Sequence, residues 1–195
     1  MTSFPWYVAR AAGLVSWVLL TAGVLWGLAI STRVLRGRPR PAWLLDLHRY
    51  LAGLATIFAG VHFVAILFDQ FVHFDLVSVL VPLASTWHPV AVAWGVAGLY
   101  LLLAVEITSL VRTRVPKRLW RATHYASFPL FAFATIHALS AGTDTRTWLF
   151  EIVAATAVMV IGYLIAVRAS NGSRRRAPVK PRTAYGERPP GLEIA

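Results

Sequence analysis

Two apolar stretches, each with one histidine near either end, decide the fold of this chain. They are residues 46–69, DLHRYLAGLATIFAGVHFVAILFD, with His48 and His62, and residues 120–142, WRATHYASFPLFAFATIHALSAG, with His124 and His137. Each stretch has the length of a membrane-spanning helix, which needs roughly 20 mostly apolar residues. At about 1.5 Å per residue, the two histidines of each helix lie about 20 Å apart along its axis. Two such helices side by side place one pair of imidazoles toward each face of a membrane.

Two stacked pairs of imidazoles are the arrangement that two bis-histidine hemes require. We therefore predict an inner heme between His48 and His124 and an outer heme between His62 and His137. The 14 steps from His48 to His62 end about 40° short of whole turns, so these two share a helix face. The 13 steps from His124 to His137 end about 140° short. Pro129 lies between them and is expected to kink the helix and change its phase.

A structural role for these histidines is the alternative. A single histidine in a membrane helix often only donates a hydrogen bond to a neighbouring helix. Polar side chains inside a bilayer are nevertheless costly and mark functional sites. Four of them, in two matched pairs on two helices, favour heme ligation.

The composition indicates a polytopic membrane protein of the all-α class. Of the 195 residues, 57% are hydrophobic and only 14% are charged, which is far from the balance of a soluble domain. The absence of cysteine excludes disulfides, iron–sulfur clusters and covalently attached heme. The net charge of +11 lies in short basic blocks between apolar runs, so we expect no nucleic-acid partner.

Hydropathy predicts a bundle of five transmembrane helices. The predicted spans are 11–30, 42–68, 89–111, 119–141 and 147–167. The first is not read as a signal peptide, because its basic cluster follows the apolar core instead of preceding it.

Lysine and arginine predict the orientation of these spans. Of the 19 basic residues, 16 lie in the links 33–40 and 112–121 and in the segment from Arg168 onward. Such residues collect on the cytoplasmic side. The N-terminus is therefore predicted outside and the C-terminus in the cytoplasm, with His48 and His124 toward the cytoplasm. We expect the membrane to be the cytoplasmic membrane of a bacterium.

Two further segments have distinct predictions. Residues 76–83 are too apolar for open solvent and are expected to lie at the membrane surface as a lid over the outer site. Residues 169–195 are rich in Arg, Pro, Gly and Ser and are predicted to be a disordered basic tail that contacts anionic lipid.

Some residues near the histidines are secondary candidates. Arg49 and Arg121 are candidates for binding a heme propionate, although contact with lipid headgroups explains them equally well. Gly53 and Gly60 would let a porphyrin approach the backbone, or would let another helix approach. Whether His73 and His88 are ligands beside the outer site is left open. Trp120 and Trp148 are predicted to be aromatic anchors at the membrane surface.

Over residues 41–168 the chain resembles the ferric reductase-like transmembrane domain. The resemblance rests on the two histidine spacings, on His48-Arg49-Tyr50, and on Lys117-Arg118-Leu119-Trp120 before His124. That family includes the membrane halves of NADPH oxidases and the heme subunit of the periplasmic methionine sulfoxide reductase system. The resemblance implies that residues 1–168 form a heme domain in which the four histidines are axial ligands of two b-type hemes.

The resemblance also implies a function in transmembrane electron transfer. About 27 residues follow the last span, and they contain no Gly-x-Gly-x-x-Gly motif. We therefore expect no bound flavin in this chain, no catalytic residues of its own, and a separate flavoprotein or membrane quinol as electron donor. The acceptor is expected outside the cytoplasmic membrane, and the chain is expected to be the heme-binding membrane subunit of an oxidoreductase.

Three alternatives differ from this interpretation in what they predict for heme. A one-heme, quinol-fed subunit of a periplasmic reductase would not need His48. A heme-free proton or metal transporter would use the histidines as a relay and show no Soret band. A membrane scaffold or heme sensor would bind heme without passing electrons to an external acceptor.

Overall fold

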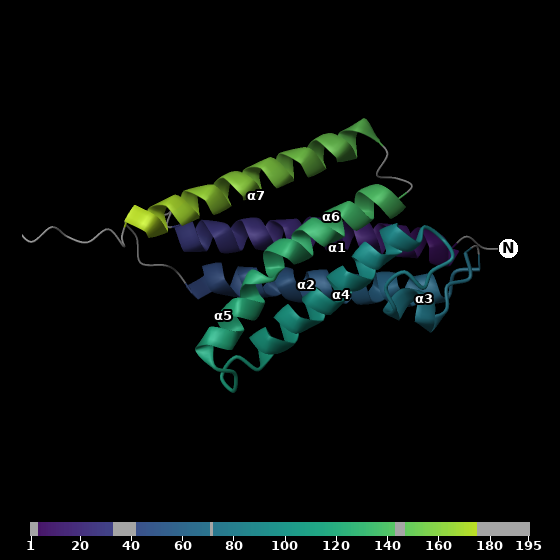
Figure 1. Ribbon diagram of the computed structural model, residues 1–195, viewed down its shortest axis with the longest axis horizontal. Helices are drawn as coiled ribbons and strands as arrows, with labels where there is room; N and C mark the ends of the chain where they lie inside the picture. The colour runs from purple at the N-terminus through teal and green to yellow at the C-terminus, as the bar shows by residue number, and fades with distance from the viewer. Residues whose placement is uncertain (1–3, 33–41, 71, 143–146, 175–195) are drawn as a thin grey trace, which may run out of the picture.

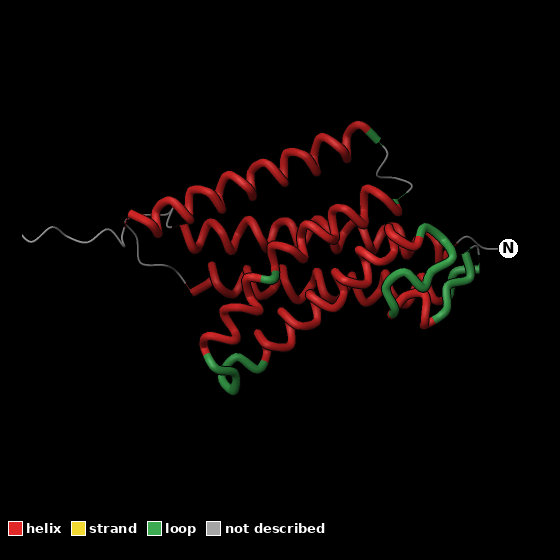
Figure 2. The backbone as a smooth tube through the Cα atoms, in the orientation of Figure 1, coloured by secondary structure: helices red, strands yellow, loops and turns green. Residues whose placement is uncertain are grey.

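The structure, a computed structural model, describes residues 4–32, 42–70, 72–142 and 147–174, and all regular structure in these residues is helical. The all-α prediction is confirmed (Figure 2). The helices are α1 (Phe4–Thr32), α2 (Ala42–Leu67), α3 (Leu76–Leu80), α4 (Pro89–Leu110), α5 (Lys117–Tyr125), α6 (Ser127–Ala141) and α7 (Trp148–Arg174).

Helix α1 is the centre of the bundle. It lies alongside α2 over most of its length and also contacts α6 and α7, while α4 packs mainly against α6 (Figure 1). A buried apolar cluster joins α1 to α6 and α7, with Trp17, Val24 and Leu28 on α1, Phe131 on α6, and Ala154, Ala157 and Ile161 on α7. The small alanines of α7 let the helix axes approach closely, as is usual between membrane helices.

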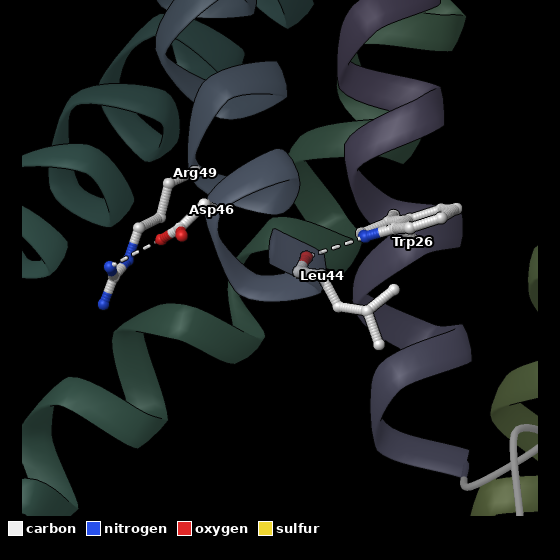
Figure 3. A network of polar contacts seen from close by, with 4 residues as sticks. All are labelled: Trp26, Leu44, Asp46 and Arg49. Carbon is white, nitrogen blue, oxygen red and sulfur yellow. Dashed lines mark hydrogen bonds and ion pairs between the residues drawn. The ribbon is translucent and has the colours of Figure 1, made fainter. Parts of the chain in front are cut away.

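Side-chain hydrogen bonds tie α1 to α2 at two levels. Ser16 Oγ donates to the carbonyl of Ala55 at 2.9 Å. Near the other end of the pair, the Trp26 indole N–H donates to the carbonyl of Leu44 at 2.8 Å (Figure 3). Both acceptors are backbone groups of α2, so these bonds fix the position of α2 along α1 and hence the heights of its two histidines.

A third interhelical bond gives a stability prediction. Trp17 Nε1 donates to Thr135 Oγ1 of α6 at 3.0 Å, and both residues are 4% exposed. Thr135→Val leaves the buried indole N–H without its acceptor, so we expect the free energy of unfolding to fall by about 1 kcal/mol. Thermal unfolding in detergent measures the change. Thr56→Val is the matched control, because its hydroxyl bonds only the Ala52 carbonyl of its own helix. Equal stability of the two variants would contradict the expectation.

Four of the described helices are long and apolar enough to cross a membrane, namely α1, α2, α4 and the Trp148–Ser170 part of α7. The predicted spans 42–68 and 89–111 match α2 and α4 to within one residue at each end. Helix α1 begins at Phe4, seven residues before the predicted start, and α7 continues to Arg174, into the predicted tail. Residues 175–195 lie outside the described part of the chain, and so do the link 33–41 and Arg146.

The predicted span 119–141 is not one helix. It is divided into α5 and α6, which are nine and 15 residues long, so neither is long enough alone to count as a span. Together they lead from the end of the bundle where α4 finishes back to the end where α7 begins (Figure 1). The prediction of five spans is therefore confirmed for four helices, and a fifth crossing by residues 119–141 stays a prediction.

The segment between α2 and α4 covers one end of the bundle (Figure 1). Asp75 caps α3 by accepting hydrogen bonds from the hydroxyl and the backbone N–H of Ser78, and these bonds lower the pKa of the Asp75 carboxyl. Val79 of α3 is buried, whereas Leu76, Val77 and Leu83 are more than half exposed. The segment thus presents one apolar side to the bundle and another away from it.

Candidate functional site

The structure brings the four histidines together as two pairs. His48 and His62 lie on α2, His124 on α5 and His137 on α6. The ring centres of His48 and His124 are 6.0 Å apart with their planes at 77°, and those of His62 and His137 are 6.2 Å apart at 76°. We refer to these as the inner pair (His48 and His124) and the outer pair (His62 and His137).

The interruption between α5 and α6 explains how both His124 and His137 can face a histidine of α2. Pro129 has no N–H to donate to the carbonyl of Tyr125 four residues earlier, which removes one helical hydrogen bond at this point. The chain turns at Ala126, whose N–H donates to Thr123 O, and α6 begins at Ser127. The turn supplies the change of phase that a straight helix with 13 steps between its histidines would lack.

Backbone carbonyls of neighbouring helices fix three of the four rings. Nδ1 of His62 lies 2.7 Å from Ala9 O, Nδ1 of His137 lies 2.8 Å from Ala91 O, and Nδ1 of His48 lies 3.1 Å from Gly23 O. A carbonyl only accepts, so each Nδ1 carries the proton, and Nε2 keeps its lone pair. An N–H bond to a carbonyl is the usual partner of a histidine whose other nitrogen binds a metal.

The distance between the rings of each pair fits one metal ion between them. An imidazole nitrogen binds a transition metal at about 2 Å and the ring centre lies about 1 Å behind it, so two rings on opposite sides of one ion have centres about 6 Å apart. Both pairs meet this condition. The described residues contain no group of three or more His, Asp or Glu arranged to hold a metal. Two protein ligands suit a group that brings its own in-plane nitrogens, as heme does.

The outer pair faces an apolar cavity of about 240 Å³ between α1, α2, α4 and α6. Its walls include Phe63 and Leu130, and Phe74, Val79 and Trp87 of the segment before α4 also line it. An apolar lining of this kind would lower the dielectric around a bound porphyrin and help to set its potential. Of the predicted lid at residues 76–83, Val79 lines the cavity, and the lid over the outer site stays a prediction.

The inner pair is less evenly supported than the outer pair. His124 Nδ1 is buried and has no hydrogen-bond partner among the described residues, and the same holds for Trp120 Nε1. The two rings are stacked, with centres 5.1 Å apart and planes at 21°, and the Arg112 guanidinium lies 5.7 Å from the Trp120 ring centre. Trp120, expected only as an anchor at the membrane surface, is thus the support of His124.

The candidate arginines Arg49 and Arg121 have exposed side chains. Arg49 forms an ion pair of 3.3 Å with Asp46, one turn earlier on α2, and both side chains are more than half exposed (Figure 3). Arg121 is exposed on α5. Arg168 of α7, which the sequence offered only as a topology signal, donates to Tyr125 Oη at 3.1 Å and to Ser31 Oγ at 2.9 Å. Tyr125 follows His124 in the sequence, so Arg168 contacts the residue next to a member of the inner pair.

The remaining candidates are two loop histidines and two glycines of α2. His73 and His88 have positive φ angles of 53° and 41° in the loops that flank α3, and His88 precedes α4. Gly53 and Gly60 have no described atom within 4 Å of the place where a Cβ would stand, so they do not serve close helix packing. Open space beside α2 is compatible with the approach of a porphyrin.

Comparison with known proteins gives one match. A family model described as "Ferric reductase like transmembrane component" matches residues 12–135, which is more than half of the chain. The match includes most of α1, as well as His48, His62 and His124, and it ends two residues before His137. No curated protein and no solved structure matches. The role of each residue therefore rests on the geometry of the site.

Proposed function

Because this chain belongs to the ferric reductase-like transmembrane family, we propose that it carries electrons across a membrane through two b-type hemes. The supporting observation is the pair of ring separations near 6 Å, with three of the four Nδ1 atoms bonded to carbonyls. Heme, when bound, supplies an iron that accepts and gives up one electron at a time. The histidines hold it at two heights, about 21 Å apart along α2.

The proposed orientation has five membrane crossings, with α5 and α6 making one crossing together. The N-terminus is then outside, the end of α7 is in the cytoplasm, and the inner pair lies on the cytoplasmic side of a bacterial inner membrane. With the inside negative, moving one electron outward gains about 2.3 kcal/mol per 100 mV. Electrons would pass from the inner pair to the outer pair, from a separate flavoprotein or quinol to an acceptor outside.

The protein's own contribution would be ligation, orientation and exclusion of water. The carbonyls of Gly23, Ala9 and Ala91 hold three rings in the tautomer that presents Nε2. The apolar wall of the outer cavity keeps the surroundings of that pair at low dielectric. Arg49, Arg121 and Arg168 are proposed as cations that balance the propionates at the cytoplasmic side, with lipid headgroups as the competing partners of the first two.

The test combines a heme count with a transport measurement. A pyridine hemochrome assay on purified protein is expected to give two noncovalent b-type hemes per chain. In liposomes with dithionite trapped inside and ferricyanide outside, the protein is expected to accelerate reduction of the external ferricyanide. Absence of a Soret band would support a heme-free transporter, and heme binding without ferricyanide reduction would support a scaffold or sensor.

The stacking of Trp120 on His124 gives a prediction for the inner pair alone. Trp120→Ala removes the support of the ring, and because aromatic pairs contribute about 0.5–1.5 kcal/mol we expect inner-heme affinity to fall by about two- to tenfold. Heme retained after dilution measures the change. Trp120→Phe, which keeps a stacking face, is expected to restore most of it. Trp148→Ala, at a 73% exposed position, is the control, and equal heme loss from it would contradict the role of Trp120.

A further inference from the structure

Three of the four histidine rings rest on a glycine of a neighbouring helix. A Cβ added at Gly13 would stand 2.8 Å from His62 Nδ1, and one at Gly95 would stand 2.8 Å from both Nδ1 and Cε1 of His137. At Gly27 the nearest atom would be His48 Cε1 at 3.1 Å. The first two distances are shorter than side-chain carbons tolerate, so any larger residue would force the ring to move.

Each of these glycines lies four residues after the carbonyl that accepts from the same ring. The combinations are Ala9 with Gly13, Gly23 with Gly27, and Ala91 with Gly95. Residues i and i+4 share one face of a helix, so a single helix face supplies both the acceptor and the open surface. We call this combination of carbonyl and glycine a seat. The seats for His48 and His62 lie on α1, and the seat for His137 lies on α4.

A seat restrains a ring in two ways. The hydrogen bond fixes the direction in which Nδ1–H points, and contact with the glycine limits rotation of the ring about that direction. Since the ring can neither turn nor approach further, its plane is set by the neighbouring helix and not only by α2 or α6. In the outer pair, where both rings have a seat, the planes meet at 76°.

We propose that Gly13, Gly27 and Gly95 are positioning residues that set the angle between the axial imidazole planes. This inference rests on the proposed function, because the rings are taken as heme ligands. The outer pair has a seat under both rings. The inner pair has one seat, under His48, whereas the His124 ring stacks on Trp120 and its Nδ1 has no hydrogen-bond partner in the described part of the chain.

The angle between the planes has a spectroscopic signature that is independent of activity. Perpendicular imidazoles interact equally with the two iron orbitals that can form π bonds to them, so these orbitals stay close in energy. A ferric low-spin iron then has a highly anisotropic electron paramagnetic resonance signal with a large g value. Parallel imidazoles separate the orbitals and give a rhombic signal. Rotation of one ring away from the perpendicular is therefore visible as a shift toward lower g.

The experiment compares oxidised, heme-loaded protein with three single alanine variants. Gly13→Ala and Gly95→Ala are expected to shift the outer-pair signal and to leave the inner-pair signal in place. Gly27→Ala, with the looser contact of 3.1 Å, is expected to shift only the inner-pair signal, and by less. Gly162→Ala on α7 is the matched control, because a Cβ there meets nothing within 4 Å. Redox titration of each variant is expected to show a changed midpoint for the same heme that shifts.

The outcomes separate this inference from the proposed function. Wild-type signals in Gly13→Ala and Gly95→Ala, with heme content intact, would overturn the role of the seats while leaving two hemes in place. A shift of the same size in Gly162→Ala would also overturn it. If one outer variant fails to fold, the other reports on the same pair from a different helix, and Gly27→Ala tests the same device on the inner pair. Wild-type protein without two low-spin signals would instead contradict the proposed function.

Discussion

Replacing His62 with alanine is expected to halve the heme content and to abolish electron transfer to an external acceptor. The outer iron would lose one of its two protein ligands, and His137 alone would have to retain the porphyrin in the cavity. The inner pair does not share these residues and is expected to keep its heme. The hemochrome assay should therefore fall from two hemes per chain toward one, and ferricyanide reduction in the liposomes should fall to the level of protein-free vesicles.

His73→Ala is the matched control for this variant, because His73 lies in the loop after α2 and outside the two pairs. His48→Ala extends the test to the inner pair. It is expected to remove the inner heme, whereas a one-heme subunit would lose nothing. The unbonded Nδ1 of His124 is the observation that favours this alternative. A His62→Ala protein with its full heme content would show that the outer pair does not hold heme.

Replacing Pro129 with alanine, which restores a backbone N–H, is expected to lower the heme content by one heme per chain. Pro129→Ala allows the Tyr125 carbonyl to accept a helical hydrogen bond, so α5 and α6 can join into one helix. In a continuous helix the 13 steps from His124 to His137 leave the two side chains about 140° apart. Because α6 is anchored to α1 through Thr135 and Phe131, α5 would be the part that rotates, and His124 would turn away from His48.

The measurement is the heme count together with the two low-spin signals, of which the inner-pair signal is expected to disappear. Pro89→Ala is the control, because Pro89 is the first residue of α4, where a helix has no hydrogen bond to lose. Circular dichroism should show helix content that is unchanged or slightly raised. Two hemes in the Pro129→Ala protein would mean that the turn at Ala126 does not depend on the proline.

Hydropathy and histidine spacing predicted the helical class and the common face of His48 and His62, because both signals depend on local sequence. The all-α class and the family are confirmed. The spacing of 14 residues on α2 correctly indicated that His48 and His62 face the same way, and the structure pairs them with His124 and His137. Heme ligation itself stays a prediction. The presence of Pro129 indicated a kink, but the sequence did not show that the chain would turn at Ala126 and divide one predicted span into two helices.

Features that depend on packing between helices could not be predicted from the sequence. Every residue has a carbonyl, so nothing marked those of Ala9, Gly23 and Ala91 as acceptors until α1 and α4 lay beside the rings. The glycines predicted to admit a porphyrin, Gly53 and Gly60, lie on α2 itself, where the structure has open space. A better signal would have been glycines on the neighbouring helices at the heights of the histidines.

Arg168 joins three helices at the inner end of the bundle. Its guanidinium donates to Ser31 Oγ of α1 and to Tyr125 Oη of α5, and it lies 5.3 Å from the centre of the Tyr125 ring. Tyr125 is next to His124 in the sequence. The contact between Arg168 and Tyr125 therefore links the end of α7 to the helix that carries His124. A shift of the end of α7 would thus change the surroundings of His124 without touching any of the four histidines.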